Sequence, residues 1–204
     1  MKRFLTLFFC WLMVWNVGWG QCPTTTSVTL STQAEVDAFD CANYAGSITI
    51  QGGEITNLNG MSELVTVGGN LLINNTTNLV SINFPNLTDI DAALRITTNA
   101  SLNSISFPNL LEVGTVVSGT YAAHSLYLNS NALLLNIDDA FPVLQTIGNN
   151  LYIGDNAALS SINTFNNLTE IGLDIWIRGN GSLTSIEGLT NITQIKRELL
   201  IENN

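Results

Sequence analysis

The feature that most constrains this chain is a short residue pattern that it repeats. Leu151–Ile162 (LYIGDNAALSSI) and Ile175–Ile186 (IWIRGNGSLTSI) share their apolar positions and their asparagine. The second apolar residue of each L-x-I triplet marks one copy, and the seven anchors are Ile50, Ile73, Ile96, Leu128, Ile153, Ile177 and Ile201. Successive anchors are 23, 23, 32, 25, 24 and 24 residues apart. Such a period is typical of a solenoid in which each repeat stacks on its neighbours.

Each copy carries the same residue types at the same distances from its anchor. Two apolar residues separated by one outward residue predict a short strand with one buried face. An asparagine stands three positions after the anchor in five copies: Asn99, Asn131, Asn156, Asn180 and Asn204. A buried side-chain amide can satisfy backbone groups that a tight corner leaves without partners, and stacked amides can bond one coil to the next. We therefore predict an asparagine ladder along one corner of the stack.

Later positions of each copy supply the interior. A leucine six residues and an isoleucine nine residues after the anchor, such as Leu102 and Ile105 after Ile96, are expected to be buried. An aromatic position follows in four copies: Phe84, Phe107, Phe141 and Phe165. Because no coil can bury its apolar face alone, stacking of neighbouring coils must provide the core.

The pattern LxIxxNxxLxSIxxFPNLxxI, from about Ser47 to Asn204, resembles the receptor L-domain family of leucine-rich-repeat-like solenoids. Leu102 follows Asn99 by three residues, whereas ordinary leucine-rich repeats usually place the next leucine after two. The head of the chain, with QCP, STQAEVDAFDC and ITNLNGM, looks most like exported bacterial members. The resemblance implies a mainly β, right-handed parallel β solenoid of about 23–25 residues per coil. It also implies binding or adhesion, and it brings no shared catalytic residues.

The chain is expected to have three parts. Residues 1–20 place Lys2 and Arg3 before an apolar run and small residues, which is typical of a secretory signal peptide. Residues 21–46 form an N-terminal cap, in which STQAEVDAF predicts a short helix covering the first coil. Residues 47–204 form the solenoid, which we expect to be cut off mid-coil because Asn204 occupies a corner position. The predicted location is therefore the exterior, secreted or at the cell surface.

Removal of the leader leaves two cysteines, Cys22 and Cys41. An even pair in an exported chain predicts one disulfide, with two buried free thiols as the alternative. Closing a loop of this length contributes about 3 kcal/mol in the chain-entropy model. We expect neither metal nor cofactor, because His124 is the single histidine and no cysteine neighbours it.

One stretch interrupts the period between Val113 and Leu126. It exceeds the repeat length by roughly nine residues, as insertions into one coil of a solenoid do. A loop is therefore expected to bulge from the stack there, either as a neutral surface loop or as a functional one.

The charge of the chain narrows its partners. The formal net charge is −10, and only six residues are lysine or arginine. Nucleic acids and anionic membranes need clustered cations for counterion release, so both are disfavoured. We expect an extracellular glycan or protein as partner, with no membrane insertion once the signal is removed.

One outward column of the predicted sheet stands out. The residues directly before the anchors are Thr49, Leu72, Arg95, Tyr127, Tyr152, Trp176 and Leu200. Strand alternation places Asp174 and Arg178 beside Trp176 on the same face. Tyrosine and tryptophan offer flat apolar area with a polar handle, suited to sugars and to protein interfaces. The candidate ligand-binding residues are Arg95, Tyr127, Tyr152, Asp174, Trp176 and Arg178.

Three other interpretations stay open from the sequence. The aromatic residues could simply stack across strands and stabilise the sheet. The solenoid could be a structural spacer that displays other modules. A polysaccharide-active enzyme would need two close carboxylates or a base beside an acid, and the acidic residues are scattered along the repeats. A non-catalytic function is therefore predicted.

Overall fold

The computed structural model describes residue 22 and residues 26–114 and 125–204. The predicted signal peptide, most of the insertion after Val113, and His124 lie outside the described residues. The cap and the repeats can be compared directly with the sequence-based expectations.

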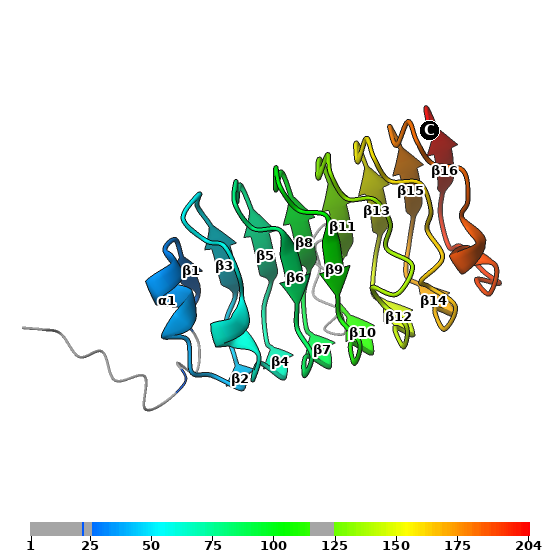
Figure 1. The fold of residues 1–204 in the computed structure, drawn as a ribbon. Helices are drawn as coiled ribbons and strands as arrows, with labels where there is room; N and C mark the ends of the chain where they lie inside the picture. The colour runs from blue at the N-terminus through cyan, green and yellow to red at the C-terminus, as the bar shows by residue number, and fades with distance from the viewer. Residues whose placement is uncertain (1–21, 23–25, 115–124) are drawn as a thin grey trace, which may run out of the picture.

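Three parallel sheets run along the described chain. The first contains eight strands, in the order β1 (Val28–Leu30), β3 (Ile48–Gln51), β5 (Leu71–Asn74), β8 (Leu94–Thr97), β11 (Leu126–Asn129), β13 (Leu151–Gly154), β15 (Ile175–Arg178) and β16 (Leu199–Glu202). The second contains six, in the order β14 (Glu170–Ile171), β12 (Thr146–Ile147), β10 (Glu112–Val113), β7 (Asp89–Ile90), β4 (Thr66–Val67) and β2 (Asn43–Tyr44). The third pairs β6 (Ser81–Asn83) with β9 (Ser104–Ser106). Figure 1 shows the strands of the first two sheets as two rows that follow the long axis of the stack.

Pairing in the first sheet confirms the register that the repeat predicted. Neighbouring strands align the anchors Ile50, Ile73, Ile96, Leu128, Ile153, Ile177 and Ile201. Burial alternates along the strands: in β3, Ile48 and Ile50 are buried, whereas Thr49 and Gln51 are only partly buried. The second sheet likewise aligns the apolar residues that close each coil, such as Ile90 and Val113. The predicted mainly β, parallel solenoid is therefore confirmed.

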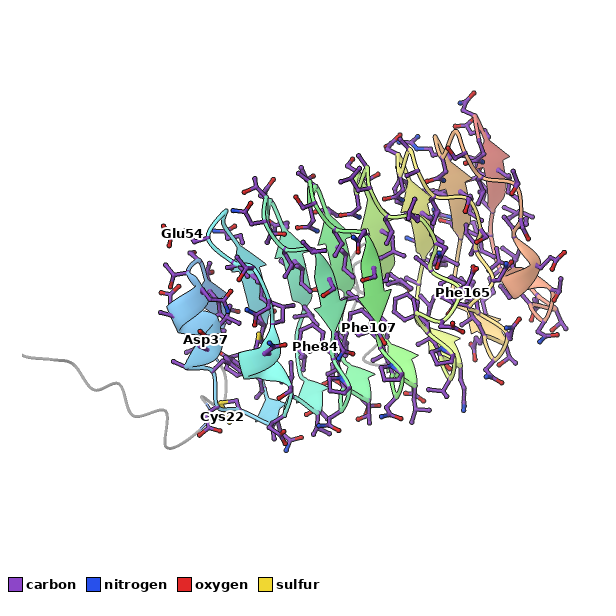
Figure 2. The ribbon with its side chains drawn as sticks, in the orientation of Figure 1. Cys22, Asp37, Glu54, Phe84, Phe107 and Phe165 are labelled. Atoms are coloured by element: carbon purple, nitrogen blue, oxygen red, sulfur yellow. A yellow bond between two sulfur atoms is a disulfide. The ribbon has the colours of Figure 1, made fainter. Side chains whose placement is uncertain are left out.

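The phenylalanine positions form a stacked column inside the solenoid. Neighbouring ring centroids along Phe84, Phe107, Phe141 and Phe165 are 5.5, 5.2 and 5.6 Å apart, with interplanar angles of 20°, 10° and 10°. All four rings are fully buried. Figure 2 shows Phe84, Phe107 and Phe165 following one another along the stack. Because aromatic pairs add about 0.5–1.5 kcal/mol beyond their buried area, this column helps to bind coil to coil.

The asparagine ladder occupies the corner after the first-sheet strands. The Oδ1 of Asn131 accepts hydrogen bonds from the backbone N (3.2 Å) and the Nδ2 (3.1 Å) of Asn99. The Nδ2 of Asn131 donates to the carbonyl oxygen of Ile96 at 2.9 Å. The corresponding contacts recur at Asn156, Asn180 and Asn204. Thr76 occupies the same position one coil earlier and donates to the Oδ1 of Asn99 at 2.8 Å. Each rung thus satisfies backbone groups in its own coil and in the preceding one.

The residue before each rung of the ladder has a left-handed backbone. The non-glycine residues in this column have φ between 54° and 58°: Asn75, Thr98, Ser130, Asp155 and Asn203. Gly52 and Gly179 occupy the same column, with φ of 116° and 69°. Asparagine, aspartate and glycine tolerate this region, whereas the β-branched Thr98 adopts it at a cost.

A short helix covers one end of the stack, as predicted. Helix α1 (Gln33–Asp37) begins after Thr32, whose Oγ1 accepts from the backbone N of Glu35 at 3.2 Å. The Oε2 of Glu35 accepts in return from the backbone N of Thr32 at 3.0 Å, which completes a capping box. Val36 is fully buried, and Figure 1 shows α1 beside β1 at the end of the stack. Strand β1 was not predicted, because its residues lie outside the repeat.

The predicted disulfide is also confirmed. Cys22 bonds to Cys41, with their Cα atoms 5.5 Å apart, so the free-thiol alternative is wrong. The bond ties the segment before β1 to the segment before β2. Two 3₁₀ helices, η1 (Asn59–Met61) and η2 (Glu187–Leu189), complete the described elements.

Candidate functional site

The outward column of the first sheet has the predicted membership. Strand pairing aligns Thr49, Leu72, Arg95, Tyr127, Tyr152, Trp176 and Leu200 across seven consecutive strands, from β3 to β16. Arg95 and the three aromatic residues therefore lie side by side on β8, β11, β13 and β15, in the middle and later part of the row in Figure 1.

The aromatic side chains of this column contact one another and two arginines. The ring centroids of Tyr127 and Tyr152 are 5.4 Å apart, and Trp176 meets Tyr152 edge-on at 6.4 Å. The Cζ of Arg95 lies 4.8 Å from the Tyr127 centroid, and the Cζ of Arg178 lies 5.5 Å from the Tyr152 centroid. The guanidinium groups of two distant coils thus converge on adjacent tyrosine rings.

Tyr152 lies down on the sheet because of the residue two positions later. A Cβ atom on Gly154 would come within 2.6 Å of the Tyr152 Cε1 and hydroxyl oxygen, so a side chain there would displace the ring. The Nε of Arg178 donates to the Tyr152 hydroxyl at 3.0 Å, and this bond raises the pKa of the Arg178 guanidinium. Only 9% of Tyr152 is exposed. Tyr152 is therefore the floor of the surface rather than a projecting ring.

Asp174 does not belong to this surface, although strand alternation had placed it beside Trp176. Its side chain is fully buried and accepts from the Nε of Arg197 at 2.8 Å, in an ion pair with that residue. The physical reason is that Asp174 precedes β15, at a corner where the chain has not yet entered the strand. The corresponding corner residues of the two preceding coils, Ser125 and Asn150, are also buried.

These corner residues form a second polar ladder that the sequence analysis missed. The backbone N of Asn150 donates to the Oγ of Ser125 at 3.2 Å, and the backbone N of Asp174 donates to the Oδ1 of Asn150 at 3.2 Å. Asn70 and Ser47 make the equivalent contact at 2.9 Å in the earlier coils. The recurrence of small polar residues three positions before each anchor was the available signal.

A shallow hollow of about 460 Å³ lies over the tyrosines. We call it the Arg–Tyr hollow; it is lined by Arg95, Thr97, Tyr127, Asn129, Tyr152, Asp155 and Arg178. Four predicted residues therefore share one site: Arg95, Tyr127, Tyr152 and Arg178. Trp176 borders this group through Tyr152, and its Nε1 donates to the Oε2 of Glu198 at 3.0 Å.

Three residues of the hollow were not predicted: Thr97, Asn129 and Asp155. Thr97 and Asn129 each follow the outward column by two residues, so the strand period could have found them. Asp155 occupies the left-handed corner position, with φ of 54°. The Asn129 amide nitrogen lies 3.1 Å from the Asp155 Oδ2 when the amide is oriented to satisfy its neighbours.

The electrostatics of the described residues set this hollow apart. Lys196 forms an ion pair with Glu170 at 3.1 Å, and Arg197 pairs with Asp174, both away from the hollow. Arg178, by contrast, is exposed, and within the described part of the chain it makes no such ion pair. Across the described ranges, no group of three histidine, cysteine, aspartate or glutamate residues gathers in a way that could hold a metal ion.

Comparison with known proteins yields one match. A family model described as Receptor L domain matches residues 40–141, half of the 204 residues. No curated protein and no solved structure matches the chain. Within the described residues, every helix is too short or too polar to cross a membrane.

Proposed function

The chain belongs to the receptor L domain family, and we propose that it is a non-catalytic extracellular module that binds a glycan or a protein through the outward face of its first sheet. Receptor L domains are extracellular, non-enzymatic ligand-binding modules. The disulfide between Cys22 and Cys41 is consistent with an oxidising, extracellular environment. Secretion or display at the cell surface is part of this proposal.

The observation that carries the proposal is the Arg–Tyr hollow. In a chain with net charge −10, two of the six lysine and arginine residues line one small surface together with two tyrosines. Tyrosine and arginine are the residues most enriched where binding energy concentrates at interfaces. Recognition is therefore proposed to occur at Arg95, Tyr127, Tyr152 and Arg178, with Trp176 at the border.

The stacking alternative accounts for the tyrosines better than for the arginines. Positions equivalent to Arg95 in the earlier coils are Thr49 and Leu72, so the fold does not require a cation there. The position of Arg178 is taken in the two preceding coils by Gly154 and Asn129. Because identical coils form without these arginines, their placement beside the tyrosines supports ligand binding.

The test is a binding screen of the chain after removal of residues 1–20, on arrays of purified extracellular glycans and extracellular proteins. Variants Tyr127→Ala and Arg178→Ala should each weaken the strongest interaction at least tenfold. Thr49→Ala is the matched control, since it changes the same outward column far from the hollow. A ligand whose affinity ignores both hollow variants would contradict this site.

Two further results would favour the alternative functions. Absence of any ligand on both arrays, for a protein shown to be folded by circular dichroism, would support a structural spacer. Hydrolysis or elimination on a panel of polysaccharides would contradict the non-catalytic proposal.

A further inference from the structure

We propose that the Arg–Tyr hollow is a subsite for a sugar that carries a carboxylate, such as a uronic or nonulosonic acid within an otherwise neutral glycan. The inference rests on the proposed binding function and names the ligand class. It follows from three kinds of group gathered within one hollow: guanidinium groups, hydroxyl-recognising polar groups, and a tyrosine floor.

The cationic part of the subsite is Arg178. Its Nε is held by the Tyr152 hydroxyl at 3.0 Å, which fixes the plane of the guanidinium. Within the described residues that is the guanidinium's one hydrogen bond, so both terminal nitrogens are left for a ligand. A planar guanidinium with two free N–H₂ groups matches the two oxygens of a carboxylate. Arg95 adds a second positive charge on the opposite side, above Tyr127.

The polar part of the subsite suits hydroxyl groups. Asp155 is exposed at its corner and offers carboxylate oxygens that accept from a ligand hydroxyl. Thr97 and Asn129 lie on the same face and are partly exposed, and each can donate or accept. A sugar acid presents hydroxyl donors together with its carboxylate, so it uses both signs of charge in the hollow.

The apolar part is the pair of tyrosines. Tyr152 lies flat above Gly154, and the adjacent Tyr127 ring is tilted by 30° to it. Together the rings make a shallow, open floor rather than a deep pocket. The C–H edge of a pyranose ring needs such a floor, whereas an apolar side chain of a protein partner needs an enclosed one.

The charge balance argues against other anions. With a net charge of −10, the chain repels long polyanions, including acidic peptide segments and nucleic acids. Asp155 would also repel a ligand that brings only negative charge to the hollow. A single carboxylate among neutral hydroxyls meets neither obstacle to the same degree.

The experiment is titration calorimetry on the chain without residues 1–20, using ligand pairs that differ only in the acid. One pair is α-1,4-linked oligogalacturonate and its full methyl ester; the other is sialyllactose and lactose. We expect at least one acid to bind, and its neutral partner to bind at least tenfold more weakly. The two pairs separate a uronic from a nonulosonic acid. An equal affinity for acid and neutral partner would overturn the proposal.

Matched variants tie the effect to the hollow. Arg178→Gln should weaken binding of the acid at least tenfold, whereas Lys196→Gln, which removes the same charge from a residue paired with Glu170, should change it less than twofold. A poly-glutamate peptide is the rival probe, and tighter binding of that peptide than of either sugar acid would overturn the saccharide class. If neither sugar acid binds, yet the array ligand is lost in the Arg178→Ala variant, this inference fails and the proposed function stands. If no array ligand depends on Arg178, both fail.

Discussion

Replacing Asn156 by alanine should destabilise the solenoid by about 3–5 kcal/mol. The Oδ1 of Asn156 accepts from the backbone N of Asn131 at 3.0 Å, and its Nδ2 donates to the carbonyl oxygen of Leu128 at 3.0 Å. Asn156 is completely buried, so alanine would leave both backbone groups without a partner and without access to bulk water. Each buried group left unsatisfied costs about 1–3 kcal/mol, and the lost amide contacts between rungs add to this.

Asn204 provides the control for this reasoning. Its Oδ1 accepts from the backbone N of Asn180 at 3.1 Å, and its Nδ2 donates to the carbonyl oxygen of Ile177 at 2.9 Å. The contacts match those of Asn156, but Asn204 is exposed, so water can replace its amide. We expect Asn204→Ala to cost less than about 1 kcal/mol.

The assay is equilibrium urea unfolding of the chain without residues 1–20. Far-ultraviolet circular dichroism follows the whole stack, and fluorescence of Trp176, the single tryptophan after residue 20, follows β15. The free energy of unfolding is compared only where the two signals coincide, because solenoids can unfold coil by coil. Equal losses in the two variants would show that burial is not the source of the effect, and a loss below about 1 kcal/mol for Asn156→Ala would refute the ladder's role.

Four further predictions concern stability. Phe107→Ala, which removes a fully buried ring stacked on both sides, should cost about 3–5 kcal/mol in the same urea assay. Thr98→Asn should raise the midpoint by a gain of about 0.5–1 kcal/mol, because asparagine tolerates the φ of 58° better than a β-branched residue does. Reducing the disulfide of the cap should cost about 3 kcal/mol and lower the thermal midpoint. The backbone N–H of Ser31 lowers the pKa of Glu35, so the capping box should stabilise fully above the unfolded pKa of about 4.3 and lose that contribution as the pH falls through the lower folded pKa, seen as acid unfolding that shifts in Glu35→Gln.

The repeat was sufficient to predict the frame of the molecule. A period of two within each strand and a spacing of 23–25 residues between most coils determine which side chains meet, so the alignment of Ile96 with Leu128 could be read across the 32-residue interval. Asn156 was assigned to the corner for the same reason. Strand β1 could not be found in this way, because Val28–Leu30 pairs with β3 without belonging to a repeat of its own.

The site was predicted in membership but not in posture. Alternation placed Arg95, Tyr127 and Tyr152 on one face, and the pairing shows them there. The orientation of the Tyr152 ring depends on the missing side chain at Gly154 and on an arginine from the next coil, and neither follows from a strand period. Asp174 was misplaced because alternation was extended past the start of β15, into a corner with its own inward-pointing column.

Stacking also explains how this chain could acquire a site without altering its fold. Every coil must supply the same inward residues, because an error at an anchor or at the ladder disturbs two neighbours. Outward positions contact only the positions beside them, so a coil can place arginine at 95 or glycine at 154 at little cost to the core. Residues 83 positions apart, Arg95 and Arg178, reach adjacent tyrosines because coil stacking converts that sequence distance into three strand steps of about 4.8 Å each. Recognition by this solenoid is therefore expected to vary with the outward column alone, and exchange of that column between coils should move the binding site while leaving the stability of the stack unchanged.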